Sequence, residues 1–222
     1  MSRLLHSLFL SLIVLVASHA LNAATEPPAH LRVAIVIDDG PVPEHSAQYL
    51  ALFAREKIHV SFSLEGRFVD AHPEMCRAVA EGGHEINNHS YSHPHFKQLD
   101  DATVLREVRD TQESIRKAVG HAPKWLWAPF LERDDRLVTL VRSAGIEYFP
   151  LEKFHFVGSM DWESTSDGAA VLKNATTNIT DGTVILVHEW PKTTFEEMPA
   201  IIAELKRQGV VFVTFSELAD GK

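Results

Sequence analysis

The stretch VIDDGPVP, residues 36–43, places two adjacent carboxylates, Asp38 and Asp39, at the end of an apolar run. The preceding residues, RVAIVI at 32–37, are rich in β-branched side chains and are typical of a buried strand. Two prolines interrupt the segment that follows, so the chain is expected to turn there. One charge would be enough to end a buried strand, and the second one therefore points to chemistry at the strand end.

Short β-rich runs and helical patterns alternate along the whole chain. The expected strands are RVAIVI at 32–37, HVSFSL at 59–64, HEIN at 84–87, WLWA at 125–128, IEYFP at 146–150, VILV at 184–187 and VVFVTF at 210–215. The expected helices lie at roughly 45–56, 73–82, 101–118, 134–144, 167–175 and 194–208. This alternation favours an α/β fold with a mainly parallel sheet, open or closed into a barrel. In both forms the active residues gather at the C-terminal ends of the strands, where Asp38 and Asp39 lie.

Composition limits the classes of protein to be considered. The chain has 222 residues, of which 45% are hydrophobic, so it is sized for one domain with a full core. Its formal net charge of −9 argues against a nucleic-acid partner. Cys76 is the single cysteine, so no internal disulfide can form. It lies in a helical pattern and is expected to be a small buried hydrophobe rather than a nucleophile.

The first 20 residues have the organisation of a secretory signal peptide. Arg3 precedes an unbroken apolar run over residues 8–17, and the small-x-small site SHA follows at 18–20. An uncleaved anchor helix is the alternative, but the run is short for spanning a membrane and no basic stop follows it. We therefore expect cleavage near Ala20, a secreted or periplasmic location and no stable membrane span after processing. The expected organisation is a signal peptide at 1–20, a polar linker at 21–30 and one domain at 31–222.

A histidine pair follows another expected strand. The segment EINNHSYSHPH, residues 85–95, contains His89 and His93, four residues apart. In one helical turn these positions share a face, so both imidazoles could reach one point, and Pro94 would end the turn. Two imidazoles and one carboxylate are the donor set of a zinc-type site that keeps one position open for water. Such pairs also occur by chance on surface helices, but a second cluster at another strand end strengthens the interpretation.

A third strand ends in a histidine. VILVHEW, residues 184–190, is an apolar run followed by His188. An imidazole titrates near working pH, which suits a proton donor or acceptor. Alone, a strand-end histidine is more often a capping or hydrogen-bonded structural residue. Together with the carboxylates and the histidine pair, it completes a hydrolytic set of metal, base and acid.

In this order the segments resemble the polysaccharide deacetylases that share the NodB homology domain, carbohydrate esterase family four. IDDGP at 37–41 looks like the first family motif, HSYSH at 89–93 like the second, GSMDW at 158–162 like the fourth and LVH at 186–188 like the fifth. Each motif is short and weak alone, but in order and at strand ends they are specific. The resemblance runs from about residue 31 to the end. It implies a distorted (β/α) barrel of about seven mainly parallel strands.

The resemblance also implies roles for the first two motifs. Asp38 would be the catalytic base. Asp39, His89 and His93 would hold a divalent transition metal, zinc in first place, with cobalt or nickel as alternatives. Adjacent side chains of an extended strand point in opposite directions, so neighbouring carboxylates can share a site only where the strand ends and turns. The alternative is that Asp38 and Asp39 are ordinary solvated surface carboxylates, but this would not explain why they directly follow a buried apolar strand.

Five more residues receive roles from the same resemblance. His188 would protonate the leaving amine, and Asp161 would pair with its imidazole. The backbone N–H of Phe130 would stabilise the oxyanion of the reaction. Trp162 and Leu186 would wall the pocket for the acetyl methyl group, although Trp162 could equally be an ordinary core residue.

The third motif departs from the family pattern of arginine-x-proline-aromatic. In KWLWAPFLERDD, residues 124–135, Trp127 stands where the arginine would orient the catalytic aspartate, and Leu131 stands where glycine is usual. An indole N–H can donate one hydrogen bond to a carboxylate, but it brings no charge and no bidentate contact. Arg133 could reach back from the following loop, or the base could be weakened or lost.

The resemblance implies a metal-dependent hydrolase that removes N-acetyl groups from an extracytoplasmic polysaccharide, such as peptidoglycan or an exopolysaccharide. Its partner would be that acetylated glycan. One alternative is a divergent deacylase that acts on an O-acetyl ester or a small amide, and another is a non-catalytic glycan-binding relative. An ester leaving group needs less protonation, so an esterase should tolerate loss of His188 better. The metal-ligand set favours chemistry, because binding alone does not require a cation with an open position.

Overall fold

The computed structural model describes residues 30–221. The expected signal peptide at 1–20 and the expected linker at 21–30, apart from its last residue, lie outside the described residues. Within the described part of the chain, no helix is both long enough and apolar enough to cross a membrane.

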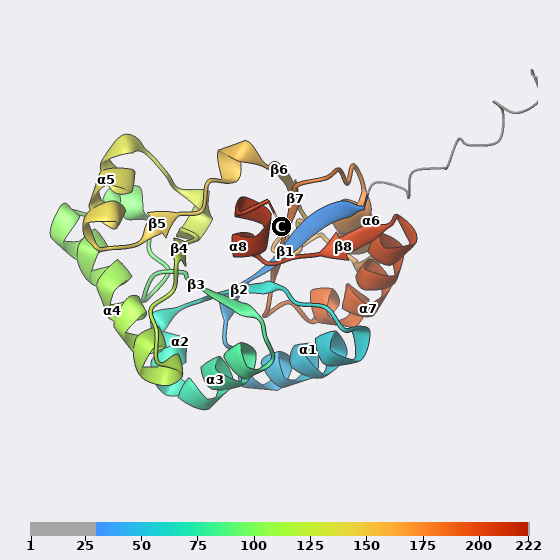
Figure 1. Cartoon of the computed structure of the whole chain (residues 1–222), viewed down its shortest axis with the longest axis horizontal. Coiled ribbons are helices and arrows are strands. Elements are labelled where there is room, and N and C mark those ends of the chain that lie inside the picture. The colour runs from blue at the N-terminus through green and yellow to red at the C-terminus, as the bar shows by residue number, and fades with distance from the viewer. Residues whose placement is uncertain (1–29, 222) are drawn as a thin grey trace, which may run out of the picture.

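A curved sheet of eight parallel strands forms the centre of the molecule (Figure 1). The strands are β1 (Leu31–Gly40), β2 (Ser61–Leu64), β3 (Glu85–Asn88), β4 (Trp125–Leu126), β5 (Glu147–Tyr148), β6 (His155–Gly158), β7 (Thr183–His188) and β8 (Val210–Phe212). Seven follow the order β5-β4-β3-β2-β1-β7-β6, and β8 pairs with β1 beside this path. Among the described residues the end strands β5 and β6 do not pair, so the sheet curls without closing. This is the distorted barrel expected from the sequence.

Most helices lie outside the curve of the sheet, while the last one lies inside it (Figure 1). They are α1 (Pro43–Glu56), α2 (Gly66–Ala71), α3 (Pro73–Glu81), α4 (Asp101–Val119), α5 (Asp135–Ser143), α6 (Gly168–Thr176), α7 (Lys192–Arg207) and α8 (Phe215–Ala219). Short 3-10 segments occur at η1 (Phe96–Gln98), η2 (Pro129–Leu131) and η3 (Leu151–Lys153). Cys76 on α3 is fully buried, as expected.

Alternate side chains of β1 belong to two different apolar cores. Ile35 and Ile37 lie in the outer core, which the surrounding helices cover. Ala34 and Val36 lie in a smaller inner core that also contains Phe215 of α8. Because both faces of the strand are covered, its sequence is an unbroken apolar run.

The alternation breaks at Asp39. Asp38 continues the inner face of the strand, two residues after Val36. Asp39 has a φ of 69°, and the register of β1 against β2 shifts between Asp38 and Gly40. Aspartate tolerates this left-handed conformation better than most residues. The irregularity keeps both carboxylates within 4 Å of the same imidazole, that of His89, instead of on opposite faces of the sheet.

Candidate active site

The C-terminal ends of neighbouring strands bring distant parts of the sequence together. Asp38, near the end of β1, is the cross-strand partner of His188, the last residue of β7. His89 directly follows β3, and Trp127 directly follows β4. The three motifs predicted to meet at one edge of the sheet therefore do so.

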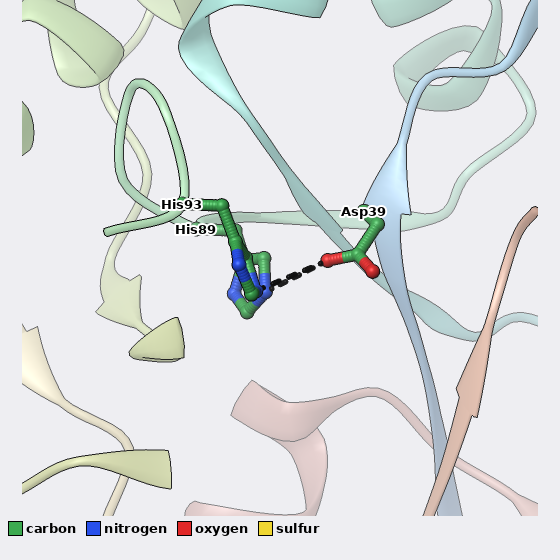
Figure 2. Close-up of side chains that lie close together, drawn as sticks. All are labelled: Asp39, His89 and His93. Carbon is green, nitrogen blue, oxygen red and sulfur yellow. Dashed lines mark ion pairs between the residues drawn. The ribbon is translucent and has the colours of Figure 1, made fainter. Parts of the chain in front are cut away.

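Figure 2 shows Asp39 pointing from β1 toward two imidazoles on the loop after β3. Its Oδ1 lies 3.2 Å from His89 Nε2 and 3.4 Å from His93 Nε2. One ligand atom from each residue lies within 4.8 Å of the other two. The structure thus brings together the three side chains that were predicted from the sequence to bind a metal.

The helical turn expected for this histidine pair is wrong. Residues 89–93 form a loop in which Ser90 has a φ of 64° and His93 a φ of 60°. The Ser90 hydroxyl accepts a 3.0 Å hydrogen bond from the His93 backbone N–H. Because Pro94 disfavours the right-handed helical region at His93, the chain folds back in this way instead. The two imidazole rings still lie only 5.0 Å apart, centre to centre.

The donor atoms fit a divalent transition metal. Nδ1 of His89 must donate its 2.6 Å hydrogen bond to the Trp127 carbonyl, since that oxygen carries no proton, and Nε2 is left to face Asp39. Asp39 Oδ1 is buried and has no aligned hydrogen-bond donor in the described residues. Tetrahedral coordination with bonds of about 2.0–2.1 Å spaces ligand atoms about 3.3 Å apart, close to the distances seen here.

The electrostatics of the cluster favour a positive charge at this point. Burial opposes a charge on His89, but Asp38 and Asp39 outweigh it and raise the pKa of its imidazole to about 9. Burial likewise opposes the charge of Asp39, yet the adjacent His89 imidazole holds the pKa of that carboxyl well below its usual range. Burial and the neighbouring His89 lower the pKa of His93 to about 4. The neutral His93 ring therefore offers a free lone pair.

Asp38 is poised differently from its neighbour. It is 3% exposed, and its Oδ2 accepts a 2.7 Å hydrogen bond from Trp127 Nε1. Its Oδ1 is buried without a hydrogen-bond partner among the described residues. Burial raises the pKa of Asp38 to about 6, although His89 and His188 oppose the shift. A carboxyl with such a pKa is ionised at neutral pH and still basic enough to accept a proton.

Trp127, which stands in the sequence where the family pattern has an arginine, contacts Asp38. Its indole is 2% exposed, lies in the inner core and directs its N–H at Asp38. Arg133 does not reach this site, because its guanidinium pairs with Glu152. Asp38 is therefore oriented by one neutral donor rather than by a charged fork.

His188 and Asp161 form a closely bonded pair. Asp161 Oδ1 lies 2.8 Å from His188 Nδ1, and Oδ2 accepts bonds from the His188 backbone N–H at 2.8 Å and from Thr194 Oγ1 at 2.6 Å. His188 Nε2 faces the metal cluster, 4.0 Å from Asp39 Oδ2. Burial lowers the pKa of His188, but the Asp161 hydrogen bond and the nearby carboxylates outweigh it and raise that pKa.

Another buried carboxyl, Glu189, ties the ends of β7 and β1 together and was not anticipated from the sequence. It is fully buried, and it accepts hydrogen bonds from the Val42 N–H at 3.3 Å and from the Ser46 hydroxyl. A Cβ at Gly40 would lie 1.8 Å from its Oε2, so a larger residue there would displace the Glu189 carboxyl. Burial raises the pKa of Glu189 to about 7. These contacts fix the loop that carries the aspartate pair.

A pocket of about 530 Å³ opens over these groups. It is lined by Asp38, Asp39, His93, Ala128, Phe130, Leu131, Phe156, Gly158, Met160, Trp162, Leu186, His188 and Trp190. Trp162 and Leu186, the expected walls, line it, and Trp162 is 36% exposed rather than part of the core. Trp190 was not anticipated; it is 48% exposed, and its Nε1 donates a 2.9 Å hydrogen bond to Asp39 Oδ2. An aromatic residue two positions after the strand-end histidine is the signal that could have identified it.

A curved parallel sheet with a metal-type cluster, a buried aspartate and an aspartate–histidine pair at its strand ends is an arrangement that suits the barrel-like hydrolases. The model of the polysaccharide deacetylase family matches residues 25–149, which is more than half of the chain, and the chain belongs to that family. The matched segment includes Asp38, Asp39, His89 and His93. It ends before His188.

Three relatives illustrate the similarity. A peptidoglycan-N-acetylglucosamine deacetylase from Bacillus cereus is 28% identical over 200 residues, covering 88% of this chain and 71% of the relative. The peptidoglycan-N-acetylmuramic acid deacetylase PdaC from Bacillus subtilis is 28% identical over 89% of this chain, which spans only 41% of that protein. The solved PdaC structure superimposes with a TM-score of 0.79 over 88% of this chain and 93% of that one. A family 4 carbohydrate esterase from Streptomyces lividans, in complex with acetate, has a TM-score of 0.75 at 27% identity over 83% of this chain and 92% of that one.

Proposed function

We propose that this protein is a metal-dependent deacetylase that hydrolyses N-acetyl groups of an extracytoplasmic polysaccharide. The observation that carries the proposal is the convergence, in one pocket, of a metal-type cluster, an unpartnered Asp38 oxygen and the His188–Asp161 pair. Zinc suits two imidazoles and one carboxylate, and cobalt or nickel would also be accepted. The peptidoglycan deacetylases to which the chain is similar support an acetylated cell-wall glycan as its substrate.

The chain's own groups divide the work of amide hydrolysis. A divalent cation held by Asp39, His89 and His93 would polarise the acetamide carbonyl and lower the pKa of a water molecule. Asp38 accepts the proton of that water through its free Oδ1 as the water attacks the carbonyl carbon. His188 donates a proton from Nε2 to the departing nitrogen, because a neutral amine is a far better leaving group than the amide anion.

The loop after β4 supplies a donor for the developing oxyanion. The backbone N–H of Phe130 has no acceptor among the described residues, and Phe130 and Leu131 both have left-handed backbones with φ of 55° and 54°. An unpaired N–H beside the pocket can bind an oxyanion without first breaking another hydrogen bond. This supports the oxyanion role that the family resemblance gave to Phe130.

The chemistry of the pocket wall favours a neutral glycan. Six large apolar side chains of the described residues are strongly exposed, and five of them line this pocket: Phe130, Leu131, Met160, Trp162 and Trp190. The described lining contains no lysine or arginine. A substrate carboxylate that rests on this apolar wall, away from the cation and His188, would therefore lose its hydration without meeting a basic side chain, whereas the C–H faces of a neutral sugar match the wall.

We expect the protein to release acetate from N-acetylglucosamine oligomers. The kcat/KM should be at least about tenfold higher than for matched oligomers that carry the lactyl carboxylate of N-acetylmuramic acid, a difference of about 1.4 kcal/mol. Acetate and free amine should appear in equal amounts. Equal rates on both glycans would refute the preference for an uncharged substrate. Acetate release only from O-acetyl esters would favour the divergent deacylase. The structural feature that favours that alternative is the uncharged Trp127, which contacts Asp38 where the family pattern has an arginine.

Asp161→Asn should shift the pH dependence of activity in a defined direction. The Asp161 carboxylate raises the pKa of His188, so its neutral replacement should lower that pKa. Protonated His188 would then be lost at lower pH, and the alkaline limb of the kcat/KM profile should move to lower pH by about one unit. The profile should be measured over pH 6–10 on an N-acetylglucosamine oligomer. An unmoved alkaline limb would contradict the role of His188 as the acid.

We also propose that residues 1–20 direct the protein out of the cytoplasm and that residues 31–222 form the catalytic domain. The support is the arginine, apolar run and small-x-small site at the start of the chain. A peptidoglycan substrate would be consistent with that destination.

A further inference from the structure

Two indoles hold the two adjacent carboxylates in the same manner. Trp127 Nε1 donates to Asp38 Oδ2 at 2.7 Å, and Trp190 Nε1 donates to Asp39 Oδ2 at 2.9 Å. In both aspartates it is Oδ1 that remains buried without an aligned donor among the described residues. Each carboxylate is thus anchored through one oxygen, while the other is left for the site.

The Trp190 contact is not a consequence of core packing. Its ring is 48% exposed, in contrast to Trp127, which is 2% exposed in the inner core. Trp190 lies just beyond β7 and before α7, and it lines the same pocket as His93. An exposed indole that served only as a pocket wall would not need to direct its N–H at Asp39.

We propose that Trp190 is a positioning residue for the metal ligand Asp39, and that its indole N–H fixes the carboxylate so that only Oδ1 faces His89 and His93. The inference rests on the proposed metal site. Donors that orient a ligating carboxylate typically change metal affinity by about 10–100-fold. An indole suits this position because it is a donor without charge, whereas lysine or arginine would repel the cation.

The anchor matters here because, among the described residues, Trp190 provides the hydrogen bond to the Asp39 carboxylate, whose other neighbours are the imidazoles of the site. The left-handed φ of 69° removes Asp39 from the strand ladder, and Trp190 supplies the hydrogen bond to its outer oxygen. Without that bond the carboxylate can rotate about its Cβ–Cγ bond, and Oδ1 is no longer held 3.2 Å and 3.4 Å from the two imidazole nitrogens. The loss should appear in zinc binding itself, with no substrate present.

The test compares Trp190→Phe with Trp162→Phe. Both indoles line the same pocket, but in the described residues Trp162 makes no hydrogen bond to a carboxylate. The Kd for zinc should be measured by competition with a chromogenic chelator, using the whole chain that remains after removal of the expected signal peptide. We expect Trp190→Phe to weaken zinc binding by at least about tenfold and Trp162→Phe to change it less than about twofold. Trp190→Gln, which restores a neutral N–H donor, should recover part of the loss.

The outcomes separate this inference from the proposal on which it rests. Wild-type protein that binds no zinc would overturn both the metal site and the role of Trp190. Wild-type protein that binds one zinc, with an unchanged Kd in Trp190→Phe, would overturn only the role of Trp190. An equal loss in the Phe and Gln variants would assign the effect to the ring and not to its N–H, and would also overturn it. Because the ring is half exposed, neither variant leaves a buried cavity, and circular dichroism of the zinc-free proteins checks the fold.

Discussion

Asp38→Asn is expected to lower kcat for deacetylation by about 10²–10⁴-fold, the loss typical of removing a general base. An asparagine keeps the size of the side chain and can still accept the hydrogen bond from Trp127. The asparagine cannot accept a proton. Proton acceptance is the role that suits Asp38, with its free Oδ1 and its pKa of about 6. The measurement is kcat for acetate release from an N-acetylglucosamine oligomer, with zinc content determined in parallel.

A matched control distinguishes this effect from a general loss of negative charge. Asp70→Asn removes an exposed carboxylate whose contact is the Tyr91 hydroxyl at 3.1 Å, outside the pocket lining. Asp70→Asn should leave kcat within about twofold of the parent, since substitutions on the surface, away from the core and the active site, usually have small effects. If Asp38→Asn retained its zinc and turned over within tenfold of the parent, Asp38 would not be the base.

His93→Ala is expected to abolish both stable zinc binding and activity. Two remaining ligands, Asp39 and His89, cannot hold a catalytic zinc that normally has three protein donors. The side chain of His93 is 23% exposed, so its removal should affect the fold little. Elemental analysis after dialysis should give about one zinc per chain in the parent and less than about 0.1 in the variant.

His95→Ala is the control for this variant. His95 lies two residues further along the same loop, stacks on the Phe130 ring at 3.7 Å and pairs with Glu132, so it is engaged elsewhere. The His95 variant should keep its full zinc content. Retention of full zinc by His93→Ala, or an equal loss in both variants, would contradict the ligand assignment.

Much of the fold could be predicted from local sequence, because both faces of β1 and β7 are covered and their apolar runs are long. All six expected helices are present, and none of their ends differs from the expected position by more than two residues. Strand β6 (His155–Gly158), helix α2 (Gly66–Ala71) and helix α8 (Phe215–Ala219) were not expected. All three are too short for a periodic pattern, and β6 is defined by its pairing with β7, a contact that is remote in sequence. Non-local pairing of this kind leaves little trace in the residues themselves.

The site shows the same division between local pattern and tertiary structure. Asp38 and His188 could be found because each ends a recognisable strand, and the two prove to be cross-strand partners. The histidine pair meets Asp39, but through a left-handed loop and not the helical turn inferred from its spacing. The position of Trp190 after the strand-end histidine could mark it as a pocket residue, but its contact with Asp39 spans 151 residues and leaves no local pattern. Residues that orient the reacting groups are thus less predictable than the groups themselves.

The most direct test of a metal-dependent deacetylase is acetate release from an N-acetylglucosamine oligomer before chelation, after chelation and after zinc is restored. We expect the purified mature protein to lose at least about 99% of its activity to the chelator and to recover most of it with one equivalent of zinc. His93→Ala should remain inactive at the same zinc concentration. Undiminished acetate release by chelated protein that elemental analysis shows to be free of metal would contradict the account.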